Sequence, residues 1–105
     1  MKPMISSVFH DPVVHELLPV FGRLLNERSS ELRRMLDLAD MPKLRTAAHS
    51  LKGSALMYGF DELAAAAAAV EQEALSGQSA GVGDRIDRIE HLAERILAGI
   101  SGGAR

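Results

Sequence analysis

Residues 42–58 read PKLRTAAHSLKGSALMY, and this stretch decides the fold. Winding it as a helix at about 100° per residue separates two faces. The apolar face consists of Leu44, Ala48, Leu51, Ala55 and Tyr58. His49 falls on nearly the opposite face, and its sector also holds Arg45, Lys52, Gly53 and Leu56. The stretch therefore predicts an amphipathic helix that buries one side and presents a histidine to solvent.

Helical periodicity precedes this stretch. Asp11-Pro12 joins a capping residue to a proline at the first helical position, which predicts a helix start. Pro19 has no backbone N–H to donate, so the pattern favours a short helix to about Leu18 and a second helix over residues 20–38. A single kinked helix is the alternative. The apolar positions at helical spacing are Val14, Leu17, Leu18, Phe21, Leu24, Leu25, Leu32, Met35, Leu36 and Ala39.

Two more helices are predicted after residue 58. Gly59 supplies a helix stop, and Asp61 is a candidate cap for the next helix. The inner positions of that helix are Phe60, Leu63, Ala67, Val70 and Ala74. A small, glycine-rich connection follows at residues 76–83, with Asp84 as the expected cap of the last helix. The buried positions of the last helix are Ile86, Ile89, Ala93, Ile96 and Ile100.

These elements predict an all-α protein. Every periodic segment is helical, and short connections make neighbouring helices antiparallel, so the economical fold is an up-and-down antiparallel four-helix bundle with a short extra N-terminal helix. A chain of 105 residues accommodates one such domain. We expect a lead-in at residues 1–10, the bundle at 11–100 and a frayed tail at 101–105.

Composition excludes several classes of function. The chain has no cysteine, so a disulfide framework and a thiolate metal site are excluded. No apolar run approaches the roughly 18 residues that a membrane span needs. Twelve basic and fourteen acidic residues give a net charge of −2 without a long basic block, which argues against nucleic acid. We expect a cytoplasmic, monomeric protein with no membrane or nucleic-acid partner.

The surroundings of His49 suit phosphoryl transfer. Imidazole is partly uncharged and nucleophilic at neutral pH, because its reference pKa is about 6.5. Lys52, one turn later, places an ammonium beside the ring, where it can stabilise charge on phosphoryl oxygens. Arg45, one turn earlier, offers a second positive charge.

Three further residues point to a docking partner. Gly53 costs the helix roughly 0.5–1 kcal/mol relative to alanine, and its missing side chain clears space beside His49. Leu56 and Met57 lie on or near the exposed sector and are candidates for an apolar docking patch.

The run AHSLKGSA at residues 48–55, followed by Gly59, Leu63 and Glu71, resembles the signature of histidine phosphotransfer (HPt) domains. In that family the helix carries His-x-x-Lys-Gly, a glycine ends it, and an alanine-rich helix follows. The resemblance covers about residues 11–99.

The resemblance implies a phosphorelay carrier without kinase activity of its own. His49 would accept a phosphoryl group from an aspartate of one receiver domain and pass it to an aspartate of another. Lys52 would be its electrostatic helper and Gly53 the clearance residue. The implied partners are response-regulator receiver domains and a hybrid sensor histidine kinase. The Mg²⁺ used in such transfers belongs to the receiver, so no metal or cofactor is expected here.

Two other classes of function remain open at this point. A helical adaptor, or pseudo-phosphotransfer domain, would bind receivers without chemistry, although such a protein is expected to lose the nucleophile. A metal site inside the bundle would need inward-facing carboxylates and Glu-x-x-His pairs, which the sequence does not offer. His10, His15 and His91 are interpreted as solvated or edge residues.

Overall fold

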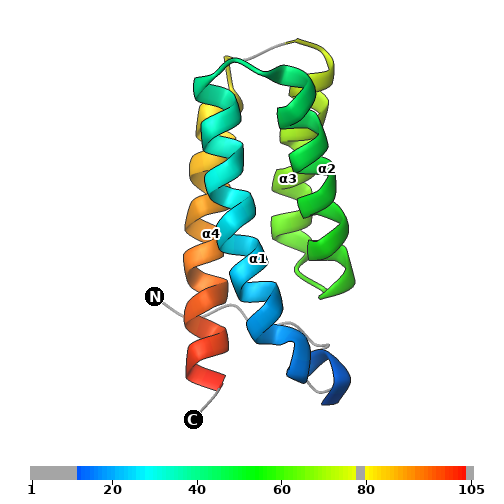
Figure 1. Ribbon diagram of the computed structural model, residues 1–105, viewed down its shortest axis with the longest axis vertical. Helices are drawn as coiled ribbons and strands as arrows, with labels where there is room; N and C mark the ends of the chain where they lie inside the picture. The colour runs from blue at the N-terminus through cyan, green and yellow to red at the C-terminus, as the bar shows by residue number, and fades with distance from the viewer. Residues whose placement is uncertain (1–11, 78–79, 104–105) are drawn as a thin grey trace.

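The structure, a computed structural model, describes residues 12–77 and 80–103. Its helices are α1, Pro12–Asp37; α2, Met41–Met57; α3, Asp61–Leu75; and α4, Val82–Gly103. Each packs against its two neighbours around the bundle, α1 against α2 and α4, and α3 against α2 and α4. Consecutive helices run in opposite directions (Figure 1). The all-α, up-and-down four-helix bundle is confirmed.

The two helix pairs differ in length. α1 and α4 contain 26 and 22 residues, whereas α2 and α3 contain 17 and 15. In Figure 1 the α2–α3 hairpin therefore lies along only part of the α1–α4 pair. The hairpin that carries His49 forms one side of the bundle, with its outer face uncovered by the other helices.

Helix α1 runs through Pro19 without interruption. This corrects the expectation of a separate short N-terminal helix, in favour of the single-helix alternative. Pro19 is exposed, while Leu18 and Phe21 are buried in the core. A mid-helix proline costs about 3 kcal/mol, and burying two large apolar side chains contributes a similar amount or more. Packing on both sides of the proline thus offsets its missing hydrogen bond.

The turn between α2 and α3 has a well-defined cause. Gly59 has a φ of 77°, a left-handed conformation that glycine adopts without steric cost. The Gly59 amide donates to the Leu56 carbonyl (3.1 Å) and the Phe60 amide donates to the Ala55 carbonyl (2.9 Å). These two bonds make a Schellman motif, which closes α2 and reverses the chain into α3.

The turn between α1 and α2 uses a different residue. Ala39 takes the left-handed conformation there, with a φ of 55°. It is exposed, so it does not continue the buried positions of α1 as the periodicity suggested. Asp40 then caps α2 by accepting a hydrogen bond from the Lys43 amide at 3.2 Å, and Pro42 stands in the first turn.

The core is aliphatic, with one aromatic cluster. The Phe21 ring stacks on Tyr58 and Phe60, with ring centroids 4.3 and 5.5 Å apart. This cluster fixes the α2–α3 turn against α1. The most enclosed large side chains are Phe21, Leu25, Leu32, Leu44, Leu51, Leu63, Val70, Val82, Ile86, Ile89, Leu92 and Ile96.

Several predicted boundaries shift by a few residues. Asp61 is the first residue of α3, and its predecessor Phe60 makes no side-chain cap. α4 begins at Val82, before Asp84. Of the expected tail, residues 101–103 belong to α4, whereas the lead-in at 1–10 lies outside the described residues. Among the helices of residues 12–77 and 80–103, none combines the length and the apolar character of a membrane span.

Candidate functional site

Helix α2 places His49 outward. Leu44, Ala48, Leu51 and Ala55 are buried against the bundle. His49 lies on the opposite face, and its side chain is 67% exposed. A foreign protein can therefore reach this imidazole without any rearrangement of the core.

Glu71 of α3 connects His49 with Lys52. Its Oε2 lies 2.6 Å from Nδ1 of His49, and its Oε1 lies 2.7 Å from Nζ of Lys52. The Glu71 side chain is only 16% exposed and that of Lys52 is 30% exposed, so both are more enclosed than the ring. One carboxylate from the neighbouring helix thus binds the histidine and the lysine at the same time.

The hydrogen bonds of Glu71 with Lys52 and His49 keep its carboxyl group ionised. The hydrogen bond from Lys52 lowers the pKa of Glu71 below its ordinary value of 4.5, and the bond to His49 acts in the same direction. Partial burial opposes both effects, but the net shift is downward. At neutral pH Glu71 is therefore a carboxylate, which can only accept hydrogen bonds.

This ionisation state selects one tautomer of His49. An acceptor 2.6 Å from Nδ1 favours a proton on that nitrogen. The neutral ring then carries its free lone pair on Nε2, the nitrogen that Glu71 does not contact. Chemically, the arrangement offers an exposed and oriented nucleophile beside an ammonium group.

A small pocket adjoins the imidazole. It encloses about 210 Å³ and is lined by Arg45, Thr46, His49 and Glu71. The Thr46 hydroxyl donates to the Pro42 carbonyl at 3.1 Å. Among the described residues, no carboxylate lies within 4.0 Å of the exposed Arg45 guanidinium. Within the described residues, the pocket therefore contains a positive charge that no ion pair balances.

The remaining candidate residues lie toward the C-terminal end of α2. A Cβ built on Gly53 would meet no atom within 4 Å, so the space beside it is open. Leu56 and Met57 are 57% and 67% exposed, so two consecutive large apolar side chains face solvent at this end of the helix. Arg45, His49 and Leu56 follow one face of α2, while Lys52 leans toward Glu71.

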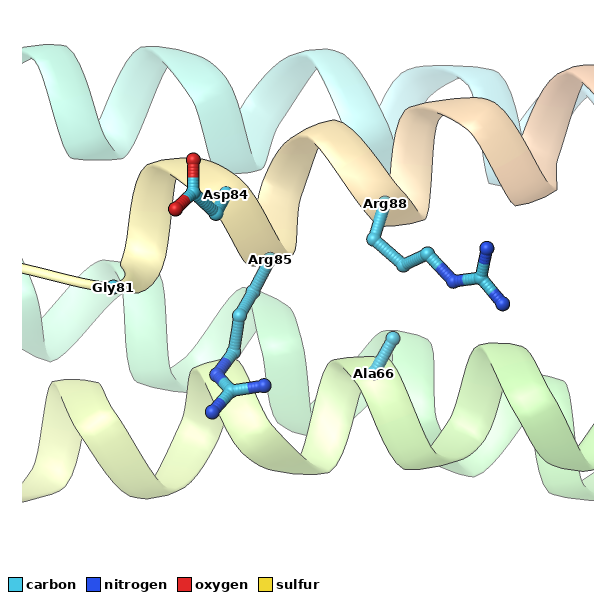
Figure 2. Close-up of a pocket in the computed structure, with 5 residues that line it drawn as sticks. All are labelled: Ala66, Gly81, Asp84, Arg85 and Arg88. Atoms are coloured by element: carbon cyan, nitrogen blue, oxygen red, sulfur yellow. The ribbon is translucent and has the colours of Figure 1, made fainter.

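A second groove lies between α3 and α4 (Figure 2). It encloses about 310 Å³ and is lined by Ala66, Gly81, Asp84, Arg85 and Arg88. Arg85 pairs with Glu73 of α3, and Arg88 pairs with Glu62. The lining of this larger groove contains no histidine, and both of its arginines are already paired. The smaller pocket at His49 is therefore the better candidate site.

The other histidines do not build a comparable site. His91 is exposed on α4, and the side chains of His10 and His15 lie outside the described residues. Over residues 12–77 and 80–103, no three His, Cys, Asp or Glu side chains gather in a way that could hold a metal ion.

Comparison with known families agrees with this geometry. A family model described as the Hpt domain matches residues 16–99, which include α2 and α3 and most of α1 and α4. The chain belongs to the Hpt domain family. Hpt domains are phosphocarrier modules of two-component phosphorelays, and they interact with receiver domains and histidine kinases. Comparisons with curated proteins and with solved structures gave no match.

The sequence predicts no role for two residues of this Hpt domain that line the pocket beside His49. Glu71 belongs only to the family signature, and Thr46 belongs to no motif. A usable signal existed for Glu71: it and His49 lie about equally far from Gly59 along the chain. In an antiparallel hairpin such residues lie opposite each other, so the turn at Gly59 sets the pairing.

Proposed function

We propose that this Hpt domain carries a phosphoryl group on Nε2 of His49, between aspartates of receiver domains. The observation that carries the proposal is the bond between Nδ1 of His49 and the Glu71 carboxylate at 2.6 Å. It holds the opposite nitrogen free on a ring that is 67% exposed. Family membership supports the same class of reaction.

The transfer step needs no proton to leave the ring. The Nε2 lone pair attacks the phosphorus of an aspartyl phosphate, the N–P bond forms, and the P–O bond to the aspartate breaks. The freed aspartate leaves as a carboxylate, and the phosphorylated ring becomes an imidazolium with its proton still on Nδ1. Glu71 then faces a positive N–H, which stabilises the phosphorylated ring. The reverse reaction passes the phosphoryl group from Nε2 of His49 to an aspartate of the next receiver, as the N–P bond breaks and a new P–O bond forms.

Lys52 and Gly53 have separate roles in this proposal. The Lys52 ammonium stabilises charge on the phosphoryl oxygens as the bond is exchanged. Gly53 leaves open space beside the ring, so that the receiver's active site can approach along α2.

The receiver docks on the face of α2 that carries His49. Leu56 and Met57 provide exposed apolar contacts at one end of this face, and Arg45 provides a positive charge at the other. We propose that the partners are receivers of response regulators and of a hybrid sensor histidine kinase. The Mg²⁺ for the transfer is held by the receiver, and the protein works as a cytoplasmic monomer.

A phosphotransfer assay tests the proposal. The purified chain is mixed with a receiver domain phosphorylated on its aspartate, and label that is acid-labile and base-stable is measured. We expect this label on the unaltered protein and on His91→Gln, a control for another exposed histidine, but not on His49→Gln. Receiver binding without any label on the unaltered protein would contradict the carrier function and favour the adaptor.

A further inference from the structure

The two cations beside His49 are in different electrostatic situations. Lys52 is paired with Glu71 at 2.7 Å and is partly enclosed between α2 and α3. Arg45 is exposed, and no carboxylate of the described residues lies within 4.0 Å of it. At rest, the charge of Lys52 is therefore balanced, whereas the charge of Arg45 is available to an incoming anion.

Position and chemistry make Arg45 suitable for that anion. It precedes His49 by one helical turn, so the two side chains are neighbours on the surface of α2. Both line the pocket of about 210 Å³, together with Glu71 and Thr46. A guanidinium presents several N–H donors in one plane and can bind two phosphoryl oxygens at once, which an ammonium cannot match in geometry.

We propose that Arg45 binds the phosphoryl group directly as it is transferred to His49, in addition to any contact with a receiver. This inference rests on the proposed function, because it assumes that His49 is the phosphoacceptor. It assigns the two cations to different tasks. Arg45 captures the incoming dianion, and Lys52 turns from Glu71 toward the phosphoryl oxygens only as their charge develops near it.

A small phosphoryl donor separates this role from docking. Phosphoramidate transfers its phosphoryl group to imidazole: the N–P bond to His49 forms, the P–N bond of the donor breaks, and ammonia leaves with a proton from water. No receiver is present, so a loss of receiver contact has no effect on this reaction. The initial rate of labelling at His49 is measured, with His49→Gln used to subtract label on the other histidines.

We expect Arg45→Gln to lower this rate about tenfold, the effect of losing one exposed charge-assisted contact in the transition state. Arg45→Lys keeps the charge but loses the planar donor pair, and we expect a smaller loss of about two- to threefold. Arg23→Gln removes an exposed arginine of α1 and serves as the control for net charge, with no change expected. Far-UV circular dichroism should show the same helicity for all of these variants, because each replaces an exposed side chain.

An unchanged phosphoramidate rate in Arg45→Gln would overturn the inference. If the same variant still lost rate with a phosphorylated receiver as the donor, Arg45 would be a partner contact alone. Failure of the proposed function gives a different result, since the unaltered protein would then acquire no label at His49 from a phosphorylated receiver.

Discussion

Two interfaces of this bundle each contain one charged side chain that bridges two partners on the neighbouring helix, but the two bridges differ in what they do. Between α2 and α3, one anion, Glu71, bridges two bases, His49 and Lys52. Between α1 and α4, one cation, Arg33, bridges two acids, Asp87 and Glu90. Each bridge shifts the pKa of its central residue: that of Glu71 is lowered, first by Lys52, and that of Arg33 is raised, first by Glu90.

The difference lies in what each bridge orients. Arg33 holds two carboxylates and orients no imidazole, so its bridge joins α1 to α4. Glu71 holds an imidazole with a free nitrogen, 67% exposed, next to open space at Gly53. The comparison teaches that a bridging ion pair is not itself a sign of function. It becomes part of a site when one of its members is a reachable nucleophile.

The largest effect is expected from removing the bridge at the proposed site. Glu71→Ala should slow transfer from a phosphorylated receiver roughly 10- to 100-fold, the range for losing a residue that orients a histidine. Glu71→Gln should recover part of the rate, because its amide oxygen still accepts from Nδ1. Glu73→Ala is the matched control, since Glu73 pairs with Arg85 instead. Equal rates in Glu71→Ala and Glu73→Ala, measured by rapid quench, would show that Glu71 does not orient His49 for transfer.

Lys52→Ala should have the next largest effect. We expect transfer to slow by about tenfold with the fold intact, because a partly exposed helical position tolerates alanine. The variant should also raise the pKa of Glu71, since the bond from Lys52 is the main cause of its lowered value. A carboxyl titration followed by NMR measures this change, and an unmoved midpoint would contradict the pairing.

The lowered pKa of Glu71 also predicts that the free energy of unfolding depends on pH. Because folding lowers the pKa of Glu71, its pairing stabilises the fold above about pH 4.5 and is lost as the pH falls through the lowered value. In Lys52→Ala the contribution of Glu71 to the free energy of unfolding should be smaller. Urea unfolding of the unaltered protein and of Lys52→Ala, at pH 7 and at pH 3, measures how much stability each loses in acid.

Gly53→Leu should have a smaller effect on phosphotransfer, which it should slow, while it makes the protein more stable. The side chain would fill the open space beside His49, so transfer from a receiver should slow several-fold. The helix should gain roughly 0.5–1 kcal/mol, because leucine is a better helix former than glycine. Labelling by phosphoramidate should be nearly unchanged, and a comparable loss with that small donor would remove the clearance role.

The smallest effect is expected at the other bridge. Arg33→Met should change the free energy of unfolding by at most about 1 kcal/mol, because Asp87 is exposed and Glu90 is partly exposed. Its phosphotransfer rate should equal that of the unaltered protein. A large loss of transfer would show that the α1–α4 face contributes to the site.

Most of the fold could be predicted because helical periodicity is local. The buried positions of α2 and α3 follow from spacing alone, and Gly59 marks the turn between them. Pro19 led to a wrong prediction because the packing that keeps α1 continuous is not local. Its cost is local and visible in the sequence, whereas the burial of Leu18 and Phe21 that offsets it depends on other helices. The left-handed Ala39 was equally hidden, since nothing in an alanine signals that conformation.

Helical periodicity along the chain is enough to establish that it forms helices, that His49 faces away from the core, and that Lys52 lies one turn along from it. The placement of Glu71 between them, 2.6 Å from one and 2.7 Å from the other, depends on the packed bundle. The faces of a helix follow from its own residues, whereas a contact across two helices follows from how they pack. The register of α3 against α2, set by the Gly59 turn and the core, turns an exposed histidine into an oriented one.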